Sequence, residues 1–168
     1  MNRIRMAFLV MGLSRGVLAQ AETLSFPQAA HDAYLDFGEK IENELAKPIP
    51  SREQLIRDLD LMLEQSIPVV QAFAGFREVC TAQLNQLLLI LPEIRAWSSE
   101  DIRINIEIGK ALPKATGCYP ARDIIAHPAI VRAFLLNTIT RIDKKQLLDE
   151  MVEAIEHMQE IGELLSKP

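Results

Sequence analysis

The stretch Ser66–Leu91 limits most strongly what this chain can fold into, because it is the longest apolar-periodic run beyond the N-terminus. Its apolar side chains recur at steps of three and four, which is the spacing of one face of an α-helix. Further apolar residues widen this stripe, so we expect a central helix that is packed on more than one side. The residues of the stripe are Phe73, Phe76, Cys80, Leu84, Leu87 and Leu91.

The amino-acid composition favours a helical fold. The chain has 168 residues, of which 49% are hydrophobic and only 5% aromatic. Aliphatic side chains without many strand-favouring aromatics are typical of helices, and this length suits one domain. We predict an all-α, single-domain helical bundle of about five to seven helices over residues 22–168.

Capping residues and helical periodicity divide the rest of the chain. Ser51 opens a helix with Gln54 three residues later, the spacing of a capping box, and Asp143 opens the last helix. Ser25 and Ser66 are the N-caps predicted for two further helices. The stretch Ile102–Ile108 alternates like a strand, but we find no second alternating segment to pair with it, so we interpret it as helix. Three prolines and a glycine predict that Leu112–Pro128 is mainly loop, with room for a turn of helix at Ala121–Ala126. The longer predicted helices are Ser25–Ala46, Ser51–Gln65, Ser66–Leu91, Pro128–Thr138 and Lys144–Ser166.

The first 21 residues, Met1–Ala21, have the pattern of a cleaved secretory signal peptide. Arg3 and Arg5 form a positive start, Met6–Leu13 is a short apolar core, and the segment ends in the small-x-small pattern Ala-Gln-Ala. Arg15, which interrupts the apolar part, argues against this interpretation. The alternative is an N-terminal helix that packs on a cytosolic protein. We predict export, with a periplasmic or secreted location.

The chain has two cysteines, Cys80 and Cys118, and they form neither a CxxC motif nor a zinc-binding spacing. In an oxidising compartment an even number of cysteines favours a disulfide. We therefore predict a Cys80–Cys118 disulfide. The alternative is a pair of buried thiols that behave as small apolar side chains.

The charge of the chain excludes several kinds of partner. Its formal net charge is -5, and loss of the three arginines in the first 21 residues lowers this value to −8. Basic residues are scattered singly, whereas nucleic acids and anionic lipids require clusters of Lys and Arg. We expect no nucleic-acid binding and no stable membrane insertion of the mature chain. If the chain has a partner, a basic protein fits this charge best.

One proline-rich segment is the best candidate for a binding site. Tyr119, Arg122, Asp123 and His127 fall within nine residues of sequence, and a disulfide at Cys118 would fix this segment to the central helix. Binding residues concentrate on loops held by a rigid scaffold, and Tyr and Arg are common in binding hot spots. The alternative is a structural connector, in which Arg122 and Asp123 only cap the adjacent turn.

No metal or cofactor site is predicted. His31 and His157 could bind haem if their helices were antiparallel. A histidine could also pair with a methionine, namely Met62, Met151 or Met158. Both histidines neighbour polar positions, however, and we interpret them as residues at the solvent edge. The missing CxxCH motif excludes covalent haem. Glu150 and Glu153 lie on an acidic, solvated helix face, and the sequence places no histidine or second carboxylate at metal-binding distance from them.

The sequence favours a non-catalytic function. The sequence contains no SxxK motif and no glycine-rich nucleotide motif. We expect an exported helical protein that binds another protein, as an adaptor, chaperone, inhibitor or immunity protein does. One alternative is a periplasmic bundle that binds a small apolar ligand or haem. A cytosolic interaction protein is the alternative if the N-terminal segment is not a signal peptide.

Overall fold

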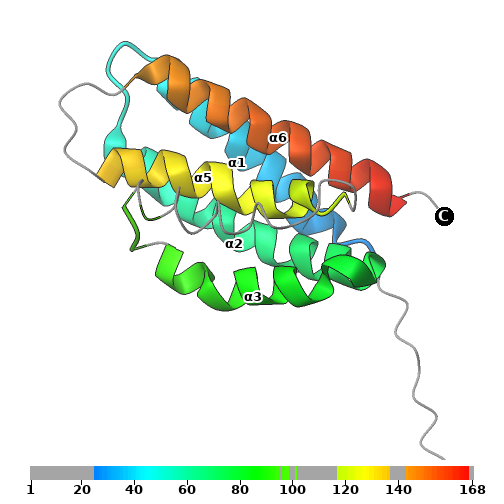
Figure 1. The fold of residues 1–168 in the computed structure, drawn as a ribbon. Coiled ribbons are helices and arrows are strands. Elements are labelled where there is room, and N and C mark those ends of the chain that lie inside the picture. Colours follow the sequence, from blue (N-terminus) through cyan, green and yellow to red (C-terminus); the bar gives the residue numbers. More distant parts are fainter. Residues whose placement is uncertain (1–24, 95, 99–100, 102–116, 137–142, 167–168) are drawn as a thin grey trace, which may run out of the picture.

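Five helices and no strand make up the described part of the computed structural model, so the predicted all-α class is confirmed (Figure 1). The described residues are 25–94, 96–98, 101, 117–136 and 143–166. The predicted signal peptide and the stretch Ile102–Ile108 lie outside them. The helices are α1 (Gln28–Ala46), α2 (Arg52–Phe76), α3 (Glu78–Ile94), α5 (Tyr119–Leu136) and α6 (Lys144–Ser166).

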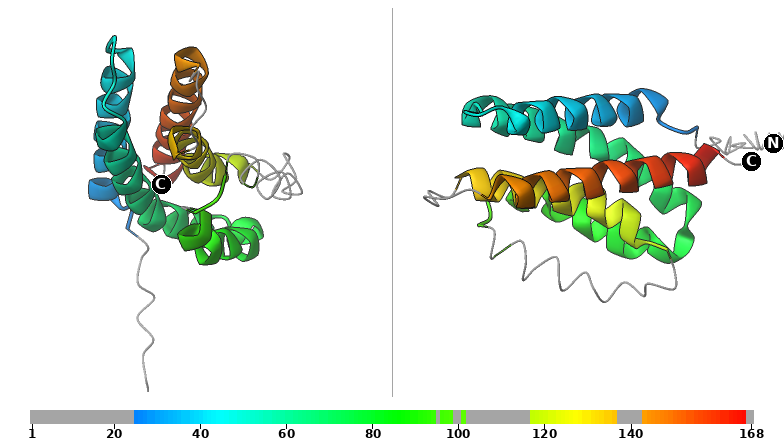
Figure 2. Two further views of the ribbon diagram at one scale, coloured as in Figure 1. Left: turned by 90° about the vertical axis from the view of Figure 1, so that its left-hand side faces the viewer. Right: turned by 90° about the horizontal axis from the view of Figure 1, so that it is seen from above.

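Four of these helices, α1, α2, α5 and α6, form an antiparallel bundle, and α3 lies outside it (Figure 2). Around the bundle, α1 packs on α2, α2 on α5, α5 on α6, and α6 on α1. The helix α3 folds back along α2 and covers one edge of the bundle. Only one side of α3 is therefore packed against the rest of the described structure.

The helix ends follow the predicted caps in two cases and differ in a third. Ser51 Oγ accepts a hydrogen bond from the backbone N–H of Gln54 at 3.4 Å, and Asp143 Oδ1 accepts one from the N–H of Lys145 at 3.0 Å. Ser25 does not cap α1, which begins at Gln28 after Pro27 and has no side-chain cap. Proline fits this position because its fixed φ suits the start of a helix.

The predicted central helix Ser66–Leu91 is wrong as a single element. Residues 66–76 continue α2, and the chain turns at Arg77 before α3 begins at Glu78. Ser66 caps nothing, because it is buried inside α2 and its hydroxyl donates to the carbonyl of Leu63 at 2.7 Å. The turn leaves Phe76 about half exposed, at 49%. The inward stripe of α3 is confirmed, with Cys80, Leu84, Leu87 and Leu91 buried.

The predicted loop Leu112–Pro128 is wrong from Tyr119 onward, because α5 begins there and continues through Pro128. A proline inside a helix has no N–H to donate to the carbonyl four residues earlier, which here belongs to Ile124. The hydroxyl of Tyr34 in α1 donates to that carbonyl at 2.8 Å. Tyr34 is fully buried, and burial raises the pKa of its hydroxyl well above 10.0, so it stays a donor.

The predicted disulfide is present in the structure. It joins Cys80 in α3 to Cys118, the residue before α5, with the two Cα atoms 5.7 Å apart. Both cysteines are buried. The disulfide therefore holds the start of α5 against the outlying helix α3.

Candidate functional site

The four residues predicted to form a binding site lie at the start of α5 rather than in a loop. Tyr119, Asp123 and His127 follow one another at steps of four, so they share one face of the helix. This face lies against α6, which runs antiparallel to α5 (Figure 1). Arg122 lies beside Asp123 on the same turns. The structure therefore brings the four predicted residues together and supplies them with neighbours from α6.

Asp123 is a buried carboxylate with a charged partner. Asp123 is only 7% exposed. The guanidinium of Arg122 donates to both of its carboxylate oxygens, at 2.6 and 2.8 Å. Buried charges need such pairing, because burial removes their hydration. The alternative reading of Arg122 and Asp123 as caps of a turn is wrong, since they pair with each other inside a continuous helix.

His127 lies between two carboxylates of α6. Its Nδ1 is 2.6 Å from Glu150 Oε2, and its Nε2 is 3.4 Å from Glu153 Oε2. The contact with Glu150 is a short hydrogen bond, in which the Nδ1–H of His127 donates to the carboxylate. Glu150 and Glu153 therefore do have a histidine beside them, although the sequence predicts none there.

His157 of α6 has a matching environment. Its Nε2 is 3.7 Å from Asp123 Oδ2, and its Nδ1 is 3.7 Å from Glu160 Oε2. The ring of Tyr119 meets its ring edge to face, with centroids 5.6 Å apart. The side chain of His157 is 21% exposed. His157 is therefore enclosed by groups from both helices, whereas the sequence analysis treated it as a solvent-edge residue.

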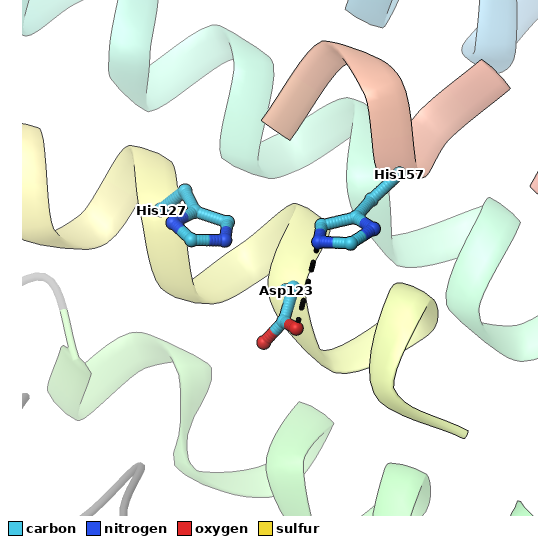
Figure 3. Close-up of side chains that lie close together, drawn as sticks. All are labelled: Asp123, His127 and His157. Carbon is cyan, nitrogen blue, oxygen red and sulfur yellow. Dashed lines mark ion pairs between the residues drawn. The ribbon is translucent and has the colours of Figure 1, made fainter. Parts of the chain in front are cut away.

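Asp123, His127 and His157 form one cluster, in which one potential ligand atom from each residue lies within 4.8 Å of the others. Figure 3 shows the two imidazole rings side by side next to the carboxylate. The rings are nearly parallel, with centroids 5.7 Å apart. Among the described residues, this is the group of three His, Cys, Asp or Glu side chains whose geometry could hold a metal ion.

A sequence signal for this cluster existed but was missed. Each helix carries a carboxylate followed four residues later by a histidine, Asp123 and His127 in α5 and Glu153 and His157 in α6. A spacing of four puts both side chains on one helix face. The signal becomes specific only when the two helices are known to be antiparallel neighbours.

The haem pair considered from the sequence, His31 with His157, does not form. The ring of His31 packs over Gly162, where an added Cβ would lie 2.5 Å from Nε2. Its Nδ1 is 3.0 Å from Asp32, whereas His157 faces Asp123. The two histidines therefore have different neighbours and do not converge on one axial site.

The outward side of α3 is a second feature with functional potential. Four of its exposed positions, Val79, Ala82, Gln86 and Leu89, follow one another at steps of three and four, so they form one stripe, which we name the α3 outer face. Val79 is 63% exposed and Leu89 is 79% exposed. Although 24% of the chain is charged, residues 79–92 contain no charged side chain.

A pocket lies where α3 meets α2, and it has a volume of about 260 Å³. It is lined by Glu64, Ile67, Leu88, Leu91 and Pro92. Pockets for drug-sized ligands usually have about 300–1,000 Å³. This pocket therefore suits one or two apolar side chains of a partner better than a separate cofactor.

No protein-family model, curated protein or solved structure matches this chain. Among the described residues, no helix combines the length and the apolar character that a membrane crossing requires.

Proposed function

We propose that this protein is exported and binds a second protein through the α3 outer face, without catalysing a reaction itself. The observation that carries the proposal is the exposure of Val79 and Leu89 on a helix that has no charge from residue 79 to residue 92. A helix that is hydrophobic on all sides is normally buried, and α3 presents two large apolar side chains to solvent. Depletion of charge is also what distinguishes the centre of a protein interface from other surfaces.

Export is supported by two observations. The segment Met1–Ala21 has the sequence of a secretory signal. The Cys80–Cys118 disulfide is compatible with an oxidising compartment, where such bonds persist. A periplasmic or secreted location follows as part of the proposal.

The partner that fits this surface is a different protein with basic residues around an apolar or uncharged patch. Two copies of this chain would bring together two acidic molecules, each with a net charge of −8 after loss of the first 21 residues. Like charges oppose such an association, whereas a basic partner is attracted and steered toward the surface. The nearby pocket between α2 and α3 can accept an apolar side chain of that partner.

The test is capture of the partner from the periplasmic or secreted fraction with immobilised mature protein, using two matched variants. Val79→Glu places a charge in the α3 outer face. Val152→Glu makes the same exchange at a 42% exposed valine of α6, outside that face. We expect a specific basic protein to bind the parent and Val152→Glu, and to be lost with Val79→Glu, because an unpaired charge would be buried in the interface.

Two results would contradict the proposal. Equal loss with both variants would show a general effect of added charge. A homodimer in sedimentation analysis that Val79→Glu dissociates would show that the face joins two copies of the chain. An intact mass that begins at Glu22 checks export separately, since it does not depend on the partner.

A further inference from the structure

We propose that α5 and α6 together form a binding site for a divalent first-row transition metal ion, with Asp123, His127 and His157 as ligands and Glu153 as the fourth. This site is distinct from the α3 outer face and does not depend on partner binding. Its residues come from two turns of each helix. The cluster in Figure 3 is its centre.

Because α5 and α6 are antiparallel, each ligand pair joins a histidine of one helix to a carboxylate of the other. Each helix carries a carboxylate and a histidine four residues apart, and each histidine faces the carboxylate of the other helix. His157 Nε2 is 3.7 Å from Asp123 Oδ2, and His127 Nε2 is 3.4 Å from Glu153 Oε2. Two imidazole nitrogens and the Asp123 carboxylate therefore converge on the space between α5 and α6, and Glu153 lies beside His127.

These distances are close to those that a bound ion requires. Zinc binds imidazole nitrogen and carboxylate oxygen at about 2.0–2.2 Å, so neighbouring ligands of a tetrahedral site lie about 3.3–3.6 Å apart. The pair at 3.4 Å lies within this range, and the pair at 3.7 Å is slightly longer. The three ligand atoms of the cluster lie within 4.8 Å, so small side-chain rotations can close the site. The side chain of Glu153 is 58% exposed and can rotate toward the ion.

One further carboxylate orients an imidazole directly, because Glu150 holds His127 Nδ1 at 2.6 Å. Glu160 lies 3.7 Å from His157 Nδ1, which is beyond hydrogen-bond distance. A metal-binding histidine almost always donates its other ring N–H to such a group, which fixes the tautomer and makes the ligand nitrogen more basic. His127 thus has Nδ1 engaged by a carboxylate, and both rings have Nε2 directed toward a ligand of the other helix.

Burial and local support favour a formed site rather than a flexible surface cluster. The side chains of His127 and His157 are 14% and 21% exposed, and that of Asp123 is 10% exposed. The guanidinium of Arg122 holds the Asp123 carboxylate, and the ring of Tyr119 packs on His157. Rigid helices with supported side chains position ligands more precisely than loops do.

The donor set selects the class of ion. Imidazole and carboxylate ligands suit Zn²⁺, Co²⁺, Ni²⁺ and Cu²⁺, whereas Ca²⁺ and Mg²⁺ prefer oxygen ligands alone. The cluster contains no thiolate, because both cysteines are in the disulfide. We therefore expect binding of Zn²⁺ that millimolar Ca²⁺ does not displace.

The test is calorimetric titration of Zn²⁺ into mature, chelator-treated protein, with Co²⁺ as a spectroscopic probe. We expect one ion per chain and a visible Co²⁺ absorption that Zn²⁺ removes. His157→Ala should weaken binding at least 100-fold, because it removes a ligand. Glu150→Gln should weaken it about 10–100-fold, the usual effect of losing an orienting carboxylate.

Two control variants separate this site from nonspecific binding. Glu156→Gln removes an exposed carboxylate next to His157, and His31→Ala removes a histidine outside the cluster. Both should keep the affinity of the parent within about twofold. Circular dichroism verifies that each variant is folded, and Glu150→Gln provides the test if a ligand variant does not fold.

Three results would overturn the proposal. The first is no binding at 100 µM Zn²⁺, a concentration about a thousandfold above the submicromolar Kd that we expect. The second is an affinity that neither His157→Ala nor Glu150→Gln changes, and the third is an equal loss of affinity with His31→Ala. The variant Val79→Glu should bind Zn²⁺ like the parent. A failure of the partner proposal and a failure of the metal proposal are therefore distinguishable.

Discussion

The hydrogen bond from Tyr34 to the carbonyl of Ile124 gives a quantitative test of how α5 tolerates Pro128. Tyr34→Phe removes only the hydroxyl, so the ring still fills the core. The carbonyl of Ile124 then loses the donor found for it, because Pro128 has no N–H. A buried acceptor without a partner costs about 1–3 kcal/mol. For a domain of this size each kcal/mol corresponds to a decrease in Tm of roughly 2–4 °C.

A double-mutant cycle in urea denaturation isolates this effect. Pro128→Ala restores an N–H that can donate to Ile124 within the helix. Tyr34→Phe should therefore cost about 2 kcal/mol in the parent and less than about 1 kcal/mol in the Pro128→Ala background. The reasoning would be refuted if Tyr34→Phe cost less than about 0.5 kcal/mol in the parent, or the same in both backgrounds.

Two further predictions concern the packing of α1 and the connection that follows it. Gly162→Ala should lower the unfolding free energy by about 1–3 kcal/mol, because its Cβ would lie 2.5 Å from the ring of His31, and His31→Ala in the same chain should recover most of this loss in thermal unfolding. The contact with Lys47 and the N–H of Ser51 lower the pKa of Glu44 below 4.5, so its stabilising contribution is complete above that pH and is lost as the pH falls through the lowered pKa. Glu44→Gln should therefore show a smaller loss of stability than the parent between about pH 5 and pH 3 in urea denaturation, and parallel curves would contradict the assignment.

The parts of the fold that the sequence predicted correctly depend on local interactions. The caps at Ser51 and Asp143 join residues two or three positions apart, so they can be identified without the tertiary structure. The bounds of the last helix and the buried stripe of α3 follow from helical periodicity alone. The disulfide follows from the number of cysteines, because two cysteines allow only one pairing.

The errors in helix assignment arose where distant contacts decide the outcome. Prolines suggested a break near residue 128, but α5 continues because Tyr34, 90 residues earlier, donates to the carbonyl that Pro128 leaves without a helical partner. Pro68 likewise lies inside α2 rather than near the start of a new helix. Local sequence shows the missing N–H but not the distant donor that replaces it.

The candidate site was predicted in part for the same reason. Tyr119, Arg122, Asp123 and His127 were identified because they are close in sequence. His157 and Glu150 were not, because the antiparallel register of α5 and α6 brings them there across more than 20 residues. The exposure of the α3 outer face also depended on the turn at Arg77, since a continuous central helix would have been covered on both sides.

Binding through the α3 outer face can be measured as the Kd of the captured partner for the parent, Leu89→Ala and Val152→Ala. Leu89 is 79% exposed in the α3 outer face, and Val152 is exposed on α6. Burial of a leucine side chain in an interface stabilises it by about 1.5–3 kcal/mol, and 1.4 kcal/mol corresponds to about tenfold in Kd. We predict at least tenfold weaker binding for Leu89→Ala and a change within about twofold for Val152→Ala. An unchanged Kd for Leu89→Ala, or an equal loss for Val152→Ala, would contradict a binding function of this face.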